Sequence, residues 1–132
     1  MTSPAPPLPP RVVAFLRAHV SSLLQLESLL LVVEAGRHTR SAADVSTEMY
    51  LPEVTVAQWL DQYAELGFCE RDGNGYRVPN DAAIYELLAE VADTYVRRKV
   101  SVGRLVYGPP VEDPKIALAD AFRIRKDERK DR

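Results

Sequence analysis

The chain contains few residues of the kinds that build metal centres and covalent active sites. It has one cysteine and two histidines in 132 residues. A single cysteine excludes an internal disulfide and any cysteine-based zinc cluster. His19 and His38 stand in separate segments without a spaced partner, so the sequence indicates neither a metal pair nor a catalytic triad. We therefore expect a protein that is not an enzyme and that holds no metal and no cofactor.

Glycine-rich loops and long apolar runs are also missing. The six glycines are scattered, and no phosphate-binding glycine loop is present. The strongest apolar run, Leu23 to Val33, is interrupted by polar residues and is too short to span a bilayer. The first ten residues are rich in proline but lack a basic cluster, unlike a signal or transit peptide. These absences predict a cytoplasmic protein with no membrane partner.

Positive charge is nearly absent from the middle of the chain. The net charge of the whole chain is −2, but it is unevenly distributed. Between Ser41 and Val96 there are eleven acidic residues against only Arg71 and Arg77, a net charge of −9. No lysine or arginine lies between Ser41 and Glu70. A segment with this charge is poorly suited to contact the phosphates of a nucleic acid.

Helix-start and helix-stop residues divide the first half of the chain into four predicted helices. Gly36 and Gly67 are suited to end a helix, because glycine readily adopts the left-handed conformation found there. Ser41, with a carboxylate three residues later, is a cap-like start, and Pro52 suits the first position of a helix. The expected helices cover residues 11–19, 22–35, 41–49 and 52–66. The second is apolar nearly all round, which predicts burial on two sides.

The following residues predict a hairpin and then a long helix. The tetrapeptide Asp72-Gly73-Asn74-Gly75 is a strong turn signal between expected strands at 68–71 and 76–79. Apolar residues then recur every three or four positions, which predicts a helix that continues to about Tyr107. Residues 100–102 also fit a strand, so this part of the chain has two interpretations.

One domain with a tail at each end is the expected organisation. The domain covers 11–107, a flexible proline-rich lead covers 1–10, and a linker, short amphipathic helix and charged tail cover 108–132. The short helix has an apolar side and a basic flank, as in segments that dock on a partner protein. Folding back onto its own domain is the other interpretation. The candidate docking residues are Ile116, Ala119, Phe122, Arg123 and Arg125.

Four segments carry a resemblance to a known fold: Ser41-Ala42-Ala43-Asp44-Val45, Pro52-Glu53-Val54-Thr55-Val56, Leu60 to Phe68, and Asp72 to Val78. Their order, helix, turn, helix and glycine-tipped hairpin, resembles the winged helix-turn-helix of small bacterial transcriptional regulators. The resemblance covers roughly residues 23–79. It implies a mainly α fold with a small β-hairpin, helical extensions at both ends, and a homodimer formed through the helix after the wing.

The same resemblance implies a transcriptional regulator that binds double-stranded DNA. In that superfamily the helix after the turn enters the major groove, and the wing touches the phosphate backbone. Arg71 and Arg77 are expected to face each other across the hairpin; the other interpretation is that they pair with Glu70 and Asp72 as surface ion pairs. The candidate DNA-binding residues are Thr55, Gln58 and Gln62 for base edges, with Arg37, Arg40, Arg71 and Arg77 for phosphates.

The charge pattern supports an alternative hypothesis. Asp61 and Glu65 lie on the same outward face as Gln58 and would repel phosphates. In this alternative the winged helix has lost DNA binding and serves as a protein-interaction or assembly module, with its acidic face against a basic partner. A regulator that senses a ligand at a dimer interface is a third hypothesis, but no residue pattern identifies such a ligand.

Overall fold

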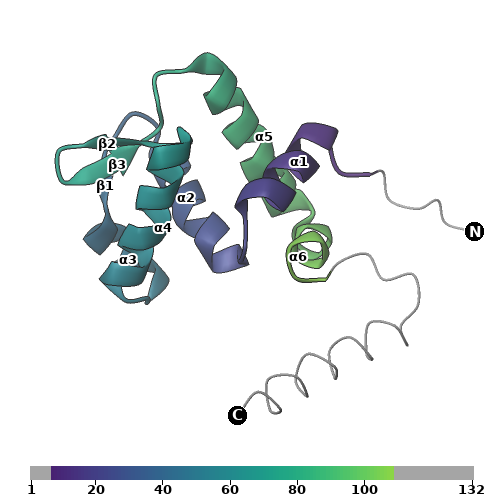
Figure 1. The fold of residues 1–132 in the computed structure, drawn as a ribbon, viewed down its shortest axis with the longest axis horizontal. Helices are drawn as coiled ribbons and strands as arrows, with labels where there is room; N and C mark the ends of the chain where they lie inside the picture. Colours follow the sequence, from purple (N-terminus) through teal and green to yellow (C-terminus); the bar gives the residue numbers. More distant parts are fainter. Residues whose placement is uncertain (1–6, 109–132) are drawn as a thin grey trace, which may run out of the picture.

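The computed structural model describes residues 7–108, and this part of the chain is mainly helical with a small antiparallel sheet (Figure 1). The elements in chain order are α1 (Pro10–His19), α2 (Leu23–Glu34), β1 (Arg40–Ser41), α3 (Ala42–Met49), α4 (Glu53–Leu66), β2 (Glu70–Asp72), β3 (Gly75–Arg77), α5 (Ala82–Arg97) and α6 (Lys99–Tyr107). The predicted fold class, mainly α with a small β-hairpin, is confirmed at this level.

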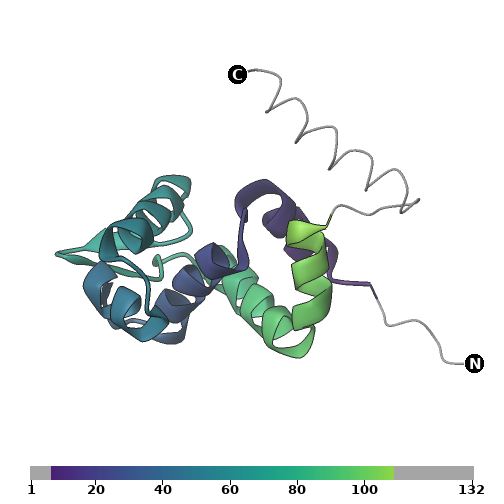
Figure 2. The same ribbon diagram turned by 90° about the horizontal axis from the view of Figure 1, so that it is seen from below.

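The elements form two groups that share α2 (Figures 1 and 2). Helices α3 and α4 pack on one another and on α2, beside the sheet, and we call this group the sheet lobe. Helices α1, α5 and α6 pack on one another and form the helical lobe. Helix α2 contacts α4 on one side and α5 on the other. The helix that follows the hairpin is therefore already covered in part by α1 of the same chain.

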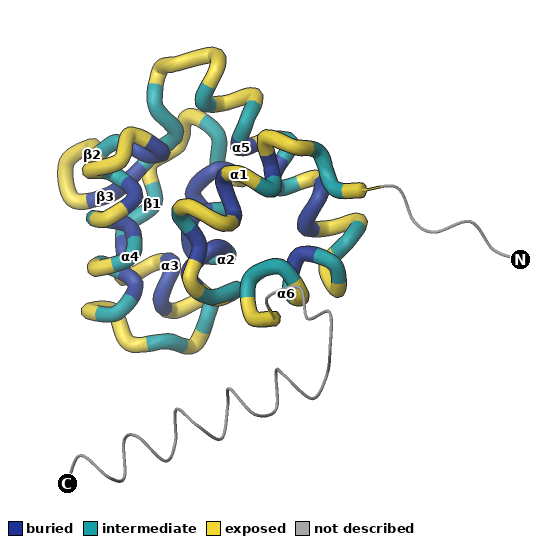
Figure 3. Tube along the Cα trace, turned by 45° about the vertical axis from the view of Figure 1, so that its right-hand side comes forward, coloured by how far each residue is buried: buried dark blue, intermediate teal, exposed yellow. Residues whose placement is uncertain are grey.

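The position of α2 explains its composition. Leu26, Leu29 and Val32 are completely buried, and Figure 3 shows α2 at the centre of the molecule. A helix between two layers loses its solvent-facing side, so apolar residues are stabilising around most of its circumference. Burial on two sides was predicted from the sequence and is confirmed, and both sides are covered by elements of the same chain.

Local signals set the helix ends where the sequence predicts them. The hydroxyl oxygen of Ser22 accepts a hydrogen bond from the backbone N–H of Gln25 at 3.1 Å. The hydroxyl oxygen of Ser41 accepts a hydrogen bond from the backbone N–H of Asp44 at 3.0 Å. These bonds satisfy backbone donors that lack a partner in the first turn of a helix. Gly67 ends α4 with φ of 88°, in the left-handed region that glycine adopts without a steric penalty.

The sheet has a third strand that the sequence did not indicate. Strand order is β1-β3-β2, and β1 contains only two residues, Arg40 opposite Tyr76 and Ser41 opposite Gly75. A two-residue strand has no alternation that sequence reasoning can detect. Its pairing depends on the hairpin being folded against it. The sheet thus connects the start of α3 to the hairpin.

The helical structure predicted after the hairpin does reach Tyr107, but it is broken at Arg98 into two helices, and the strand interpretation of residues 100–102 is wrong. The backbone leaves the helical conformation at Arg98, with φ of −133° and ψ of 45°, and α6 starts immediately afterwards. The break allows α6 to turn back onto α1, which buries Val102. The Tyr107 hydroxyl then accepts a hydrogen bond of 2.7 Å from the N–H of Leu23. Tertiary packing favours the break over a longer helix.

The order helix, strand, helix, helix, strand, strand from α2 to β3 is compatible with a winged helix. No single helix within residues 7–108 is long and apolar enough to cross a membrane. Helices α1 and α2 reach that length and composition only as a pair, and they are bent by 117°. Most of the predicted lead and tail lies outside the described residues, including the candidate docking residues Ile116, Ala119, Phe122, Arg123 and Arg125.

Candidate functional site

The outward face of α4 combines amides with carboxylates. Gln58, Gln62 and Glu65 are exposed, while Thr55 and Asp61 are partly buried. These positions recur every three or four residues, so they share one side of the helix. The opposite side of α4 is held in the core by Val56, Leu60 and Tyr63. The face therefore presents groups that can read base edges beside groups that repel phosphates.

The hairpin is joined to α4 by a charged cluster. Arg71 Nη2 lies 2.9 Å from Asp61 Oδ1, and the Tyr76 hydroxyl donates a hydrogen bond of 2.5 Å to the same oxygen. The Tyr76 bond, followed by the Arg71 guanidinium, lowers the pKa of Asp61. Burial, together with the bond to Asp61, raises the pKa of Tyr76 to about 12. The Arg71 charge is thus already paired with a carboxylate of α4.

The second arginine of the hairpin is paired with acidic residues of the neighbouring strand. Arg77 Nη2 lies 2.8 Å from Glu70 Oε2, and Nη1 lies 3.7 Å from Asp72 Oδ2. Arg77 is opposite Glu70, whereas Arg71 is opposite Tyr76. Adjacent cross-strand pairs point to opposite faces of a hairpin. The expectation that Arg71 and Arg77 face each other is therefore wrong, because the hairpin register places them on different faces.

Arg40 is held along α3. Its Nε lies 2.8 Å from Asp44 Oδ2, and its Nη2 lies 2.9 Å from Glu48 Oε1. Only 17% of its side chain is exposed. The hydrogen bond to Asp44 is the main cause of a raised pKa of Arg40. This guanidinium has two carboxylate partners at short distance, so a phosphate would have to displace them.

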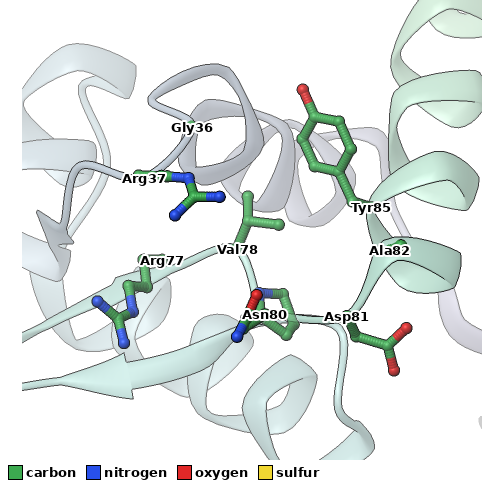
Figure 4. Close-up of a pocket in the computed structure, with 9 residues that line it drawn as sticks. Gly36, Arg37, Arg77, Val78, Asn80, Asp81, Ala82 and Tyr85 are labelled. Carbon is green, nitrogen blue, oxygen red and sulfur yellow. The ribbon is translucent and has the colours of Figure 1, made fainter.

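Arg37 lies beside a cleft of about 550 Å³ between the α2–β1 link, the end of β3 and the start of α5. Figure 4 shows Arg37 and Arg77 at one side of this cleft and Tyr85 at the other. Arg37 makes no hydrogen bond or ion pair within residues 7–108, unlike the other three candidate phosphate anchors. The Asp81 carboxylate caps α5, accepting hydrogen bonds from the N–H groups of Ala83 and Ile84. The helix N-terminus is therefore already occupied by an anionic group.

Sequence reasoning missed two exposed apolar pairs at helix–helix corners. Tyr50 is 93% exposed and Val54 67% exposed on either side of the α3–α4 turn. Val96 is 80% exposed and Val100 70% exposed on either side of the α5–α6 break. The exposure of the first pair could have been predicted from the sequence, because Tyr50 directly follows the last residue of the helix predicted at 41–49. The exposure of the second pair could not, because it depends on the break at Arg98.

Cys69 is a core residue. It is only 2% exposed, and its thiol donates a weak hydrogen bond of 3.5 Å to the Leu60 carbonyl. Burial raises the pKa of the Cys69 thiol to about 12. A thiol is a poor nucleophile while it stays protonated. Cys69 therefore contributes to the packing of the core.

The Cys69 thiol should resist alkylation in the folded protein. We expect modification by iodoacetamide at pH 8 to be at least about tenfold slower in the native protein than in denaturant. Mass spectrometry at timed intervals measures the rate of adduct formation. Equal rates in both conditions would show that the hairpin base opens freely and would contradict the packing described here.

The charged cluster at Asp61 should contribute to acid stability. The folded-state pKa of Asp61 is lowered, so its contribution is present above its unfolded pKa and is lost as pH falls through the folded value. The free energies of unfolding of the wild type and Asp61→Asn should therefore converge as the pH falls below about 4. Urea unfolding at a series of pH values measures this difference.

Glu65→Gln is the matched control for that experiment. Glu65 is exposed on the same helix and makes no ion pair within the described residues. Its variant should track the wild type across the acid range. A difference for Asp61→Asn that stays constant with pH would mean that the Asp61 charge is not the stabilising feature.

Among residues 7–108, no group of three or more histidine, cysteine, aspartate or glutamate side chains is placed to hold a metal ion. The site that the structure assembles consists of the outward face of α4, the hairpin joined to it, and the ion-paired arginines around them. In comparisons with known proteins, no family model, no curated protein and no solved structure matches the chain.

Proposed function

We propose that this protein is a non-enzymatic binding module of the winged-helix type, and that the acidic face formed by α3 and α4 binds a basic protein surface. One observation carries the proposal: carboxylates of the same chain pair with Arg40, Arg71 and Arg77. Those three arginines are three of the four candidate phosphate anchors. Pairing occupies these cations, while the exposed Glu53 and Glu65 make no ion pair within the described residues, which favours a cationic partner over DNA.

The ion pairs affect recognition of a partner even though each contributes little to folding stability. An exposed ion pair contributes little to folding stability, because water solvates both charges well. Their effect here is on recognition, since a phosphate must compete with a carboxylate that is already in contact. Net charge adds to this competition, because residues 41–96 carry −9 and repel a polyanion at a distance.

Transcriptional regulation through DNA binding is the second candidate. Specific observations favour it: Gln58 and Gln62 are exposed on α4, and Arg37 is unpaired within the described residues. A glutamine amide can donate to and accept from adenine in the major groove. In this candidate function Arg37 binds the phosphates of the DNA backbone. Other arginines join it after they are released from their carboxylate partners.

A photoreactive amino acid at Gln58 distinguishes the two candidates. The substituted protein is produced in its own cells, irradiated, and digested with nuclease before electrophoresis. The protein-binding proposal predicts a discrete adduct that resists nuclease. Ala14, exposed on α1, is the matched control position and should give no such adduct.

Retention on a mixed pool of genomic DNA fragments completes the test. The proposal predicts no retention at about 50 mM salt, where phosphate contacts are strongest. Retention that falls steeply with salt and is lost in Arg37→Gln would contradict the proposal and support the DNA-binding candidate. A nuclease-sensitive adduct at Gln58 would lead to the same conclusion.

A further inference from the structure

The turn between α3 and α4 presents apolar side chains among carboxylates. Tyr50 and Val54 are 93% and 67% exposed. Tyr50 has φ of 57° and ψ of 43°, a left-handed conformation that residues other than glycine rarely adopt. Its ring remains in solvent, outside the core. We call this surface the acidic corner, and it consists of Glu48, Tyr50, Glu53 and Val54, all exposed.

The break between α5 and α6 presents the opposite arrangement. Val96 and Val100 are 80% and 70% exposed, and cations lie between them in the sequence. Arg97 pairs with Asp93 of its own helix, yet 74% of its side chain remains exposed. The Lys99 ammonium lies 5.2 Å from the centre of the Tyr95 ring. We call this surface the basic corner, and it consists of Val96, Arg97, Lys99 and Val100.

The two corners cannot meet within one chain. Figures 1 and 2 show the α3–α4 turn at the far side of the sheet lobe and the α5–α6 break in the helical lobe, with α2 between them. Single exposed apolar residues are normal on protein surfaces. Here the exposed charges nearest in sequence to each apolar pair have one sign, and the two signs are opposite, although Glu48 also contacts Arg40 and Arg97 also contacts Asp93. An apolar centre with a charged rim is the composition of a protein interface.

We infer that the acidic corner of one copy of this protein binds the basic corner of a second copy. The inference rests on the proposed function, because it names the partner of the α3–α4 face. Glu53 and Lys99 make no ion pair within the described residues and can pair directly. Glu48 and Arg97 exchange their partners Arg40 and Asp93 for one another, and two apolar pairs cover each other. If the copies are related by a two-fold axis, both corners of each copy are used and the assembly closes as a dimer.

Charge reversal with complementation tests this contact. One variant carries Glu48→Lys and Glu53→Lys, and the other carries Arg97→Glu and Lys99→Glu. Each variant alone presents corners of like charge, so we expect its dimer dissociation constant to rise at least about tenfold. An equimolar mixture presents complementary corners again and should associate as the wild type does. Sedimentation velocity over a concentration series measures both results.

Matched controls exclude a general attraction between oppositely charged variants. Glu34→Lys with Glu86→Lys, and Arg17→Glu with Arg37→Glu, change the net charge by the same amounts at exposed positions outside the corners. Each control pair should associate like the wild type when alone. Circular dichroism melting curves identify any variant that fails to fold. For the apolar part, Val96→Ser with Val100→Ser should weaken association without changing net charge.

The wild type should form a concentration-dependent dimer at about 50 mM salt that weakens at about 500 mM. A wild type that stays monomeric up to about 1 mM at low salt overturns the inference. Reversals at the control positions that weaken association equally, or a mixture that fails to associate, also overturn it. If the Gln58 photoadduct then contains a different protein, the proposed function survives without this partner. A nucleic-acid adduct overturns the proposed function itself.

Discussion

Replacing Tyr63 by alanine should lower the free energy of unfolding by about 3–5 kcal/mol, the largest effect that we expect for a single residue. Tyr63 is 1% exposed on the inner side of α4. Its ring lies 6.5 Å from that of Phe15 and 6.4 Å from that of Phe68, measured between centroids. Alanine would leave a cavity where α1, α4 and the base of the hairpin meet. Urea unfolding monitored by circular dichroism measures the loss.

Tyr63→Phe separates packing from hydrogen bonding at the same position. The Tyr63 hydroxyl donates a hydrogen bond of 3.1 Å to the backbone carbonyl of His19. Phenylalanine keeps the ring and loses this bond, so its cost should be about 1 kcal/mol. Equal losses for the two variants would mean that the hydroxyl, and not the ring, carries the contribution of Tyr63. Such a result would contradict the packing argument.

Gly75→Ala should destabilise the protein by about 1–3 kcal/mol and disrupt the pairing of β1 with β3. A Cβ at this position would lie 2.4 Å from Thr39 Cγ2 and 2.8 Å from the carbonyl oxygen of Arg40. The Thr39 methyl could rotate away, but the Arg40 carbonyl belongs to the backbone. Relief therefore requires β1 to move. Chemical unfolding gives the free energy, and hydrogen exchange at the strand amides reports the local opening.

Gly103→Ala is the matched control, and its expected effect has the opposite sign. Gly103 lies inside α6, and a Cβ there would meet Leu23 Cδ1 at 3.6 Å, an ordinary contact. Alanine in a helix interior is favoured over glycine, so this variant should gain about 0.5–1 kcal/mol. If both substitutions destabilised the protein similarly, close backbone approach at Gly75 would not be the cause.

Much of the local structure was predictable because its causes lie within a few residues. The caps at Ser22 and Ser41 and the glycine end at Gly67 depend on side-chain and backbone geometry near each position. The hairpin turn is local too, although only Gly73 of its tip has a positive φ. The mainly helical fold class followed from these signals, together with apolar periodicity.

The candidate site was predictable only in its residue types. The sequence identified Gln58 and Gln62 as exposed amides, and it identified the acidity around them. It offered Glu70 and Asp72 as partners of the hairpin arginines, which is confirmed for Arg77 and wrong for Arg71. Arg71 reaches Asp61, ten positions earlier in the chain, only because the hairpin folds against α4. Contacts of that kind depend on the register and the docking of elements, which no local pattern encodes.

The sequence by itself determined the helix ends at Ser22, Ser41 and Gly67, the hairpin turn and the uneven charge, because these depend on neighbouring residues or on composition. The tertiary structure decided the two-residue strand β1, the break at Arg98 and the pairing of Arg71 with Asp61. Strand β1 and the Arg71 pair form only when the hairpin folds against β1 and α4, and the break is stabilised by the packing of α6 on α1. These contacts join separate elements, so they leave no periodic signal in the chain.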